Sequence, residues 1–337
     1  MCVNVVVYAT GVPTVTWGSV EYVANGAGYK LALKHVAAQT KTKARRPILI
    51  IPGYGMNSFI FGFHPKGHSL ESYLAAHGFD VWSADLRGQG RSRRDHGSSS
   101  NFGLAEMAID DIRFALAHVV ARSESPDGLV DVIGCSLGTA LTLGHLAHHP
   151  NAPIGSFVSL GGLIRWVTVH PLLRLAFSSP KLIGKVRLRH TRPLARIALP
   201  LLVRYLPSVL AMYMNANSTD TSHANLMVQT VEDPSPRINQ EIAEWIISRD
   251  LILRDVNVTH RLRGMKHPLL CVVAKHDGVV PPATARAVYE LMGSSKKELL
   301  EVGDDAMKMA HADLFISHEA ETRVFQHIVD FLDRHHT

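Results

Sequence analysis

One stretch of the chain constrains its fold more than any other: the sequence VDVIGCSLGTALTLG, which runs from Val130 to Gly144. Its first part belongs to a Val- and Ile-rich run (129–134) that predicts a buried strand, and its second part to an apolar segment (137–149) that predicts a helix. Only the pentapeptide GCSLG separates them, so the chain must reverse within a few residues, and the flanking glycines relieve the crowding. The central residue of this turn, Ser136, is therefore expected to project alone.

Strand-like runs alternate with helix-like segments along most of the chain. Runs rich in β-branched and apolar residues occur at 47–51, 80–86, 129–134, 154–160, 268–274 and 298–302. Helical periodicity occurs at 69–78, 104–121, 137–149, 283–292 and 319–336, the last with Val324, Ile328, Phe331 and Leu332 spaced along one face. This alternation predicts an α/β fold with a mainly parallel sheet and helices on both of its faces.

Residues 163–256 break the alternation. They are rich in Leu, Arg and Pro and contain no strong strand pattern, so we interpret them as an inserted helical cap. The predicted organisation is a core built from residues 1–162 and 257–337, with the cap between them. Charge is distributed unevenly: residues 132–219 contain nine Lys and Arg and no Asp or Glu, whereas the whole chain has a net charge of +6.

Composition narrows the class of protein and its compartment. The chain has 337 residues, of which 46 % are hydrophobic, so it can bury a large core, which argues against general disorder. Its three cysteines, Cys2, Cys135 and Cys271, argue against a disulfide framework and favour a cytoplasmic location. The first residues lack the pattern of a secretory signal. The longest stretch without Asp, Glu, Lys or Arg (132–164) is broken by Gly, His, Pro and Asn, unlike a membrane-spanning helix.

A serine at the tip of such a turn is a candidate nucleophile, but a hydroxyl attacks poorly until a base takes its proton. In folds that carry this turn, an acid and a histidine follow the serine in that order. Asp277 follows the predicted strand 268–274, and His311 follows the last predicted strand. We therefore predict Ser136, Asp277 and His311 as the catalytic residues, with the carboxylate fixing the imidazole tautomer. The alternatives are His276, His318, His327, His335 and His336 for the base, and Asp250, Asp304 and Asp305 for the acid.

Acyl-transfer chemistry also needs two backbone N–H groups aimed at the developing oxyanion. One is expected from Leu137, the residue after the serine. The other is expected from Tyr54 in the loop PGYGMNS, which follows the predicted strand 47–51. The alternative is that this loop is a glycine turn without a catalytic role. Cys135 lies one place before the tip of the turn and is expected to point into packing.

Together these motifs resemble those of the α/β-hydrolase superfamily, in particular its esterase- and lipase-like serine hydrolases. DLRGQGRS (85–92) resembles a structural segment of many members, DGVVPP (277–282) the segment around their acid, and HADLF (311–315) the segment around their histidine. The segment 21–36 looks like the leading β-hairpin of lipase-like members. The resemblance covers about 1–160 and 257–337 and fades in the cap.

Three departures from family patterns bear on the chemistry. Many members carry His-Gly before the oxyanion donor, whereas this chain has Pro52 at the histidine position, and the backbone donor is expected to survive the change. The polyhydroxyalkanoate synthases place a cysteine at the tip of the turn. In this chain Cys135 lies one position before the tip, which disfavours a cysteine nucleophile. A serine at the tip also excludes the aspartate nucleophile of the family's epoxide hydrolases and haloalkane dehalogenases.

The resemblance implies a serine hydrolase that cleaves carboxylic esters of apolar or lipid-like acyl groups through an acyl-enzyme on Ser136. Two alternatives stay open: an acyltransferase that uses the same residues, and a non-catalytic ligand-binding protein of this fold. We expect a small-molecule ester as the binding partner and no cofactor. We also expect no metal, because His148-His149 and His335-His336 lack a spaced set of further ligands and HExxH is absent.

The basic, apolar segment 174–214 has three interpretations. It could be a lid that contacts an anionic membrane or lipid aggregate through its apolar face, which would make the protein peripherally membrane-associated. It could instead be an acyl pocket with a basic rim that attracts anionic substrates. It could also be an ordinary helical cap with a solvated basic face. Nucleic-acid binding is not expected, because the segment has no recognised binding motif or stacking pattern.

Overall fold

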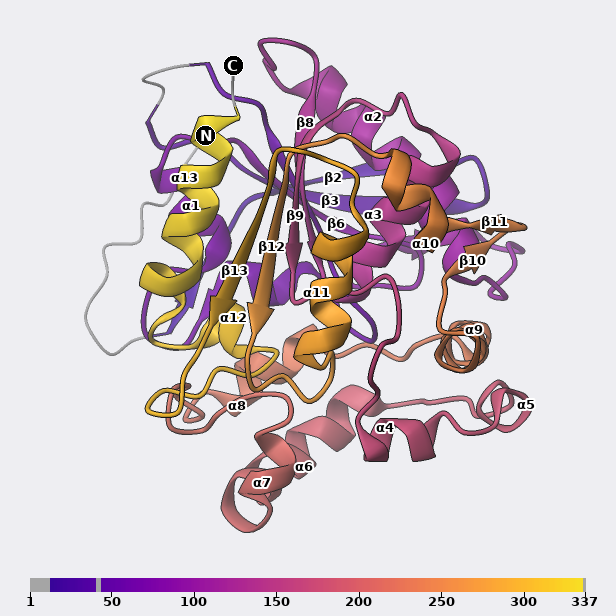
Figure 1. Cartoon of the computed structure of the whole chain (residues 1–337), viewed down its shortest axis with the longest axis vertical. Coiled ribbons are helices and arrows are strands. Elements are labelled where there is room, and N and C mark those ends of the chain that lie inside the picture. Colours follow the sequence, from indigo (N-terminus) through magenta and orange to yellow (C-terminus); the bar gives the residue numbers. More distant parts are fainter. Residues whose placement is uncertain (1–12, 41–43, 336–337) are drawn as a thin grey trace.

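The central sheet has nine strands within residues 13–40 and 44–335, which are the residues that the computed structural model describes (Figure 1). The strand order is β13 (Lys297–Val302), β12 (Leu269–Ala274), β9 (Ile154–Leu160), β8 (Val130–Cys135), β4 (Ile48–Ile51), β6 (Val81–Asp85), β3 (Tyr29–Val36) and β2 (Ser19–Ala24), with β7 (Arg93–Arg94) paired to β3. Two small sheets pair β1 (Thr14–Val15) with β5 (Phe63–His64) and β10 (Ile252–Leu253) with β11 (Val256–Asn257).

The six strands from β13 to β6 run parallel, and β2 and β3 form an antiparallel hairpin at one edge. This arrangement confirms the predicted α/β-hydrolase fold with a mainly parallel sheet. The hairpin register pairs Tyr22 with Ala32, which agrees with the hairpin expected over residues 21–36. The two-residue period of a strand sends alternate side chains of β12 to opposite faces of the sheet. Leu269, Cys271 and Val273 join one hydrophobic core, and the residues between them join the other.

Each core is closed by its own helical layer. The first is covered by α2 (Ile112–Arg122), α3 (Leu137–His148), α10 (Val258–Arg261) and α11 (Pro282–Leu291), with a π-helical turn at Glu106–Asp111 and a 3₁₀ turn at Leu262–Gly264. The second is covered by α1 (Leu70–Ala76), α12 (Asp313–Ile316) and α13 (Gln326–Arg334), with a 3₁₀ turn at Ser58–Gly62 and a π-helical turn at Glu321–Phe325. The four apolar residues predicted to share one face of the last helix are all buried.

The helix α1 shows how local sequence sets these boundaries. Ser69 caps its start by accepting a hydrogen bond from the backbone N–H of Ser72 at 3.2 Å, which satisfies one of the free donors of a helix N-terminus. The chain leaves the helix through Gly78, whose φ of +88° is a conformation that glycine adopts at little cost. The helix therefore ends where the sequence predicts.

Residues 163–256, called the cap segment below, contain α4 (Pro171–Ala176), α5 (Pro180–Ile183), α6 (Thr191–Tyr205), α7 (Pro207–Leu210), α8 (Ala224–Met227), a 3₁₀ turn at Val228–Thr230, and α9 (Pro236–Ser248). Helices α4 to α8 lie across the end of the molecule toward which β12 and β13 point (Figure 1). Helix α9 packs into the first core through Ile238, Ile242 and Trp245. That the cap segment forms a separate domain with these boundaries remains a prediction. The inferences about residues 1–12, including Cys2, and about His336 concern positions outside the described residues.

Candidate active site

The predicted turn between β8 and α3 is present, with Ser136 at its tip. Its φ of 52° and ψ of −120° lie in a region that non-glycine residues rarely adopt. The Ser136 N–H donates to the carbonyl of Leu160 at 3.0 Å, and the Ser136 carbonyl accepts from Thr139 N–H at 3.0 Å. Gly138 must be small, because a Cβ there would lie 2.2 Å from the carbonyl oxygen of Ile51. The surrounding backbone therefore holds the serine in a strained conformation at the carboxyl end of the sheet.

His311 and Asp277 form a buried hydrogen-bonded pair. His311 Nδ1 lies 2.5 Å from Asp277 Oδ2, and the two side chains are 6 % and 1 % exposed. The other carboxylate oxygen, Asp277 Oδ1, accepts hydrogen bonds from the N–H groups of Val279 and Val280, both at 2.8 Å. Since both oxygens are occupied, the carboxylate has one orientation and presents Oδ2 to the imidazole. A carboxylate on Nδ1 favours the tautomer that leaves Nε2 free to accept a proton.

The end of β9 lies between the serine and the histidine. Leu160 accepts the hydrogen bond from Ser136, and the next residue, Gly161, packs against the imidazole: a Cβ there would lie 3.5 Å from His311 Cε1. Within the described part of the chain, no hydrogen bond joins the Ser136 hydroxyl to His311. Catalytic hydrogen bonds of this kind often form only when substrate binds. The structure thus brings the predicted base and acid together, and residues Leu160 and Gly161 lie between them and the serine.

The loop after β4 approaches the serine closely. A Cβ on Gly53 would lie 2.9 Å from Ser136 Cβ. Gln89 Nε2 donates to the carbonyl of Gly53 at 3.2 Å, while Gln89 Oε1 accepts from Leu86 N–H at 3.0 Å. In a trans peptide the carbonyl and the N–H point in opposite directions, so the N–H of Tyr54 points away from Gln89. Leu137 is the first residue of α3, where a helix leaves its N–H groups without internal partners.

The cap segment is hydrogen-bonded to both loops that carry the pair. Gly278 N–H, next to the acid, donates to the carbonyl of Met212 at 2.9 Å, and Ala312 N–H, next to the histidine, donates to the carbonyl of Tyr213 at 2.7 Å. The Tyr213 ring lies 6.1 Å from the His311 ring, centroid to centroid. A change in this part of the cap segment would therefore shift the loops that carry Asp277 and His311.

Asp313 holds the histidine loop to the cap segment. Its buried carboxylate accepts from the N–H groups of Ala310 at 2.8 Å and Asn215 at 2.9 Å, and from the hydroxyl of Thr219 at 2.8 Å. Burial is the largest influence on this carboxyl group and raises its pKa from 3.8 to about 6, although the hydrogen bonds oppose the shift. Asp313 is two residues from His311, so it is a positioning residue for the base.

Asp313→Asn should change how stability depends on pH. The folded protein holds the Asp313 proton more tightly than the unfolded chain does. The protonated carboxyl group therefore adds to the free energy of unfolding below pH 3.8, and this contribution is lost as pH rises through about 6. The free energy of unfolding of the wild type should fall relative to the variant by on the order of 3 kcal/mol between pH 4 and pH 7. Urea unfolding across that range measures the difference. Asp305→Asn, which alters an exposed carboxylate nearby, should track the wild type, and parallel curves for Asp313→Asn would contradict the assignment.

Cys135 packs in the second core and is 1 % exposed. Burial raises the pKa of its thiol well above the usual range, and the negative charge of Asp277 raises it further. A thiol of this kind stays protonated and unreactive, since the thiolate is the nucleophile. Of the two adjacent residues, only Ser136 lies at the tip of the turn.

An apolar cavity of about 460 Å³ lies between the core and helix α6; Ser136, Asp277 and His311 do not line it. One wall residue, Tyr213, connects it to the histidine, because the Tyr213 ring lies 6.1 Å from the His311 ring, centroid to centroid. Tyr213 belongs to its wall, and that side chain is 37 % exposed although burial raises the pKa of its phenol. The two observations agree if the exposed part of the ring faces the cavity, not open solvent. Its wall has Thr and Tyr hydroxyls but no charged side chain; the residues from α6 are Thr191, Leu194, Ala195, Ala198, Leu199 and Leu202.

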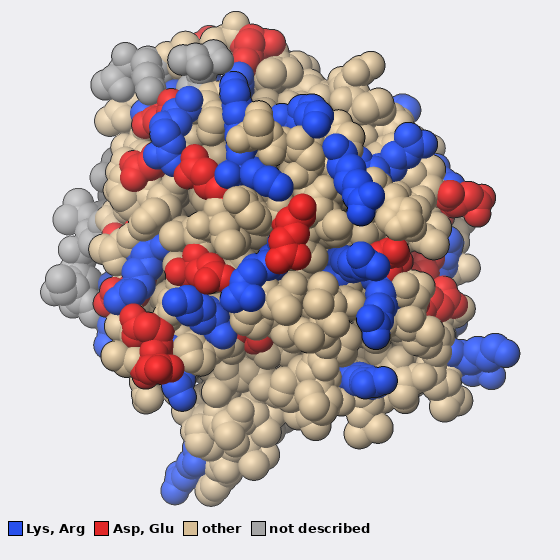
Figure 2. Space-filling view, in the orientation of Figure 1, with Lys and Arg blue, Asp and Glu red and all other residues tan. Residues whose placement is uncertain are grey.

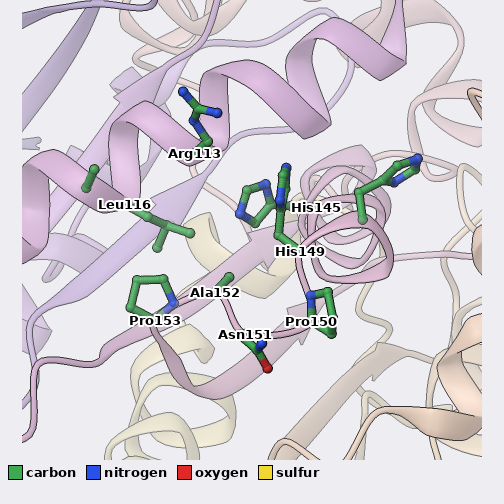
Figure 3. A pocket seen from close by; sticks show the side chains of 10 residues that line it. Arg113, Leu116, His145, His149, Pro150, Asn151, Ala152 and Pro153 are labelled. Carbon is green, nitrogen blue, oxygen red and sulfur yellow. The ribbon is translucent and has the colours of Figure 1, made fainter.

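A second hollow of about 420 Å³ lies at the other end of α3, between that helix, α2 and the loop before β9 (Figure 3). It contains Arg113, His145 and His149. Burial lowers the pKa of His145 to about 4, and its Nδ1 lies 3.1 Å from the carbonyl oxygen of Ala108. Since α3 has 12 residues, this hollow is about 18 Å from Ser136 along the helix axis. It is therefore separate from the serine and its neighbours.

Two further features bear on the kind of site. In residues 13–40 and 44–335, no three His, Cys, Asp or Glu side chains gather as a metal-binding group. Across the same residues, no helix combines the length and apolar character that crossing a bilayer would need.

Two of the alternative acids lie away from His311 in the structure. Asp250 forms an ion pair with Arg165, and Asp304 is exposed at the surface, so neither contacts His311. Sequence reasoning missed Gln89, Asp313 and Tyr213, which orient the loops around the predicted site. Gln89 lies within the motif at 85–92, but nothing in that motif indicates that its amide reaches Gly53.

Comparisons with known proteins bear on the family and the fold. The model of the family described as "Serine aminopeptidase, S33" matches residues 42–304. A search of curated proteins found no match.

Many solved structures share the fold at low sequence identity. A soluble variant of the monoglyceride lipase of Saccharomyces cerevisiae is 15 % identical with a TM-score of 0.65, covering 96 % of each chain. An enol-lactonase from Burkholderia xenovorans is 15 % identical with a TM-score of 0.62, covering 94 % of this chain and all of the other. An esterase from Thermogutta terrifontis is 16 % identical with a TM-score of 0.60, covering 95 % of this chain and all of the other.

Proposed function

The chain belongs to the "Serine aminopeptidase, S33" family of α/β hydrolases, and from that membership we propose that it cleaves carboxylic esters with apolar acyl groups through an acyl-enzyme on Ser136. The observation that carries this proposal is the buried His311–Asp277 pair beside a strained turn that presents a serine. A hydroxyl nucleophile, a base and an oriented acid are the parts that acyl transfer needs.

The proposed reaction has two halves. Ser136 Oγ forms a bond to the ester carbonyl carbon while His311 Nε2 takes the hydroxyl proton, and the N–H groups of Tyr54 and Leu137 stabilise the oxyanion. As the carbonyl re-forms, the bond to the alcohol oxygen breaks, and His311 returns the proton to the leaving alcohol. Water then attacks the carbonyl carbon of the acyl-enzyme while His311 Nε2 takes one of its protons. As the bond to Ser136 Oγ breaks, His311 gives that proton to the serine oxygen, and the carboxylic acid leaves.

The apolar cavity behind Tyr213 favours an apolar acyl group over a peptide amino terminus. A substrate with a charged α-amino group needs a carboxylate partner in the site, since burying an unpaired charge is costly. The cavity wall has no Asp or Glu, and residues 132–219 contain none. An acyl chain needs only apolar surface and excluded water, and the cavity provides that surface.

Intact mass measurement after treatment with a fluorophosphonate probe tests the proposed nucleophile. We expect one adduct on the wild type and on Cys135→Ala, and none on Ser136→Ala. A panel of p-nitrophenyl esters should then show kcat/KM rising with acyl length. Product analysis with added alcohol separates hydrolysis from transfer, because an acyltransferase would form the new ester. An unlabelled wild type that still binds acyl ligands would overturn the proposal in favour of a non-catalytic binding protein.

A further inference from the structure

Helix α6 exposes an apolar stripe to the outside of the molecule. Leu194, Ile197, Leu201 and Tyr205 recur at helical spacing and are 52–66 % exposed. Helices α4, α5 and α7 expose further apolar side chains; the exposed apolar residues of α4 to α7 and their junctions, called the outer cap face below, are Leu172, Leu175, Leu182, Val186, Leu188, Leu194, Ile197, Leu201, Tyr205, Leu206 and Val209. Exposed apolar surface on this scale marks an interaction site more often than single exposed side chains do.

The same region is strongly basic. All nine Lys and Arg of residues 132–219 lie between Arg165 and Arg204, and this stretch has no carboxylate of its own. Two of them, Arg165 and Arg192, form ion pairs with Asp250 and Glu232. Within the described residues no ion pair to a carboxylate involves the other seven, which are Arg174, Lys181, Lys185, Arg187, Arg189, Arg196 and Arg204. In Figure 2 the lower end of the visible face carries blue side chains among tan residues and no red.

The opposite face of α6 lines the apolar cavity. Ala195, Ala198, Leu199 and Leu202 line it, and Leu194 borders both the cavity and the outer cap face, so this helix is apolar on two sides. A helix that is apolar on several sides is normally buried on all of them. Here the inner side is covered by the core, and none of the residues that the structure describes covers the outer side. Helix α6 therefore separates the apolar cavity from any partner that contacts the outer cap face.

Charge decides between the two simplest occupants. A second copy of the chain would bring the same unpaired cations against these cations, and like charges at close range disfavour contact. An anionic bilayer supplies the missing negative charge at the level of the headgroups and apolar chains just below it. Exposed Leu, Ile and Tyr with interspersed Arg and Lys are the composition of helices that lie in the interface plane.

We propose that the outer cap face docks on an anionic lipid bilayer, with α6 lying at the boundary between headgroups and acyl chains. Docking places the cavity directly behind the helix that touches the lipid. In its second part, which rests on the proposed function, an ester drawn from the bilayer enters the cavity past α6 and reaches Ser136 without crossing water.

Vesicle sedimentation tests the docking surface with the full-length protein. The vesicles are phosphatidylcholine alone, or equal parts of phosphatidylcholine and phosphatidylglycerol. We expect binding to the anionic vesicles only, weakened at about 1 M salt relative to about 0.1 M. Ile197→Asp with Leu201→Asp should lower the partition coefficient at least tenfold. Neither residue lines the cavity, so turnover of a water-soluble short-chain ester should stay unchanged and shows that the variant is folded.

A matched control and an inactive variant make the outcomes distinct. Ile252→Asp introduces the same charge at an isoleucine that is 55 % exposed on β10, away from the outer cap face, and should bind vesicles like the wild type. Ser136→Ala should also bind normally. If the wild type binds anionic vesicles but hydrolyses no ester, the docking proposal stands and the proposed function fails. If soluble esters are hydrolysed but anionic vesicles are not bound, or if the protein dimerises through this face without lipid, docking is overturned.

Discussion

Ser136→Ala is expected to lower kcat for ester hydrolysis by about 10⁵- to 10⁶-fold, the size of loss seen when a serine nucleophile is removed from a hydrolase triad. The alanine keeps a Cβ of the same size, so the strained backbone at φ 52° and its hydrogen bonds to Leu160 and Thr139 should persist. Only the attacking oxygen is lost. Steady-state kinetics with a chromogenic ester measures the effect, with thermal unfolding to confirm that the variant folds as the wild type does.

Cys135→Ala is the control for the neighbouring nucleophile. Its thiol is buried and protonated, so the variant should keep ester turnover within a few-fold of the wild type while losing some stability from the smaller side chain. Comparable activity in Ser136→Ala and the wild type would mean that the chemistry is carried by another residue.

Asp277→Asn is expected to lower kcat by about 10⁴-fold without unfolding the protein, as such a change does in a serine-protease triad. Asp277 Oδ1 already accepts from the N–H groups of Val279 and Val280. An asparagine would keep its carbonyl oxygen there and turn its NH₂ group toward His311 Nδ1. The imidazole would then accept at Nδ1 and carry its proton on Nε2, so Nε2 could not take the serine proton.

The comparison with a neighbouring acid makes this result specific. Asp304→Asn, at an exposed carboxylate that contacts no catalytic group, should leave kcat within a few-fold of the wild type. The same fluorophosphonate probe reports activation of the serine independently of turnover, and its rate should fall with kcat in Asp277→Asn. A loss confined to Asp304→Asn would reassign the acid.

Local patterns predicted much of this fold, since strand and helix periods involve residues that are neighbours along the chain. The apolar run at 268–274 predicts the strand that the structure has as β12, and the structure divides the side chains of this strand between two cores. The turn at Ser136 and the acid and histidine after late strands also have local signals. The order of elements along the chain places all three at the same end of a parallel sheet, which is why their convergence could be expected.

The supporting residues could not be predicted in the same way. Asp313 and Asn215 are 98 residues apart, and Gln89 and Gly53 are 36 apart. Single polar side chains in loops have no period, and their partners depend on how the loops pack. The basic composition of the cap segment is also visible in the sequence. Which of its apolar and basic side chains are exposed to solvent depends on how the helices pack.

The sequence by itself therefore determined the α/β sheet, the serine turn and the chain order of the predicted nucleophile, acid and base, because each is specified by spacing between nearby residues. Only the tertiary structure decided that His311 meets Asp277 and not Asp304, and that Met212 and Tyr213 hold the loops of Asp277 and His311 to the cap segment. It alone decided that α6 has a cavity behind it and an uncovered apolar face in front. These contacts join distant segments, and their geometry exists only once the whole core has packed.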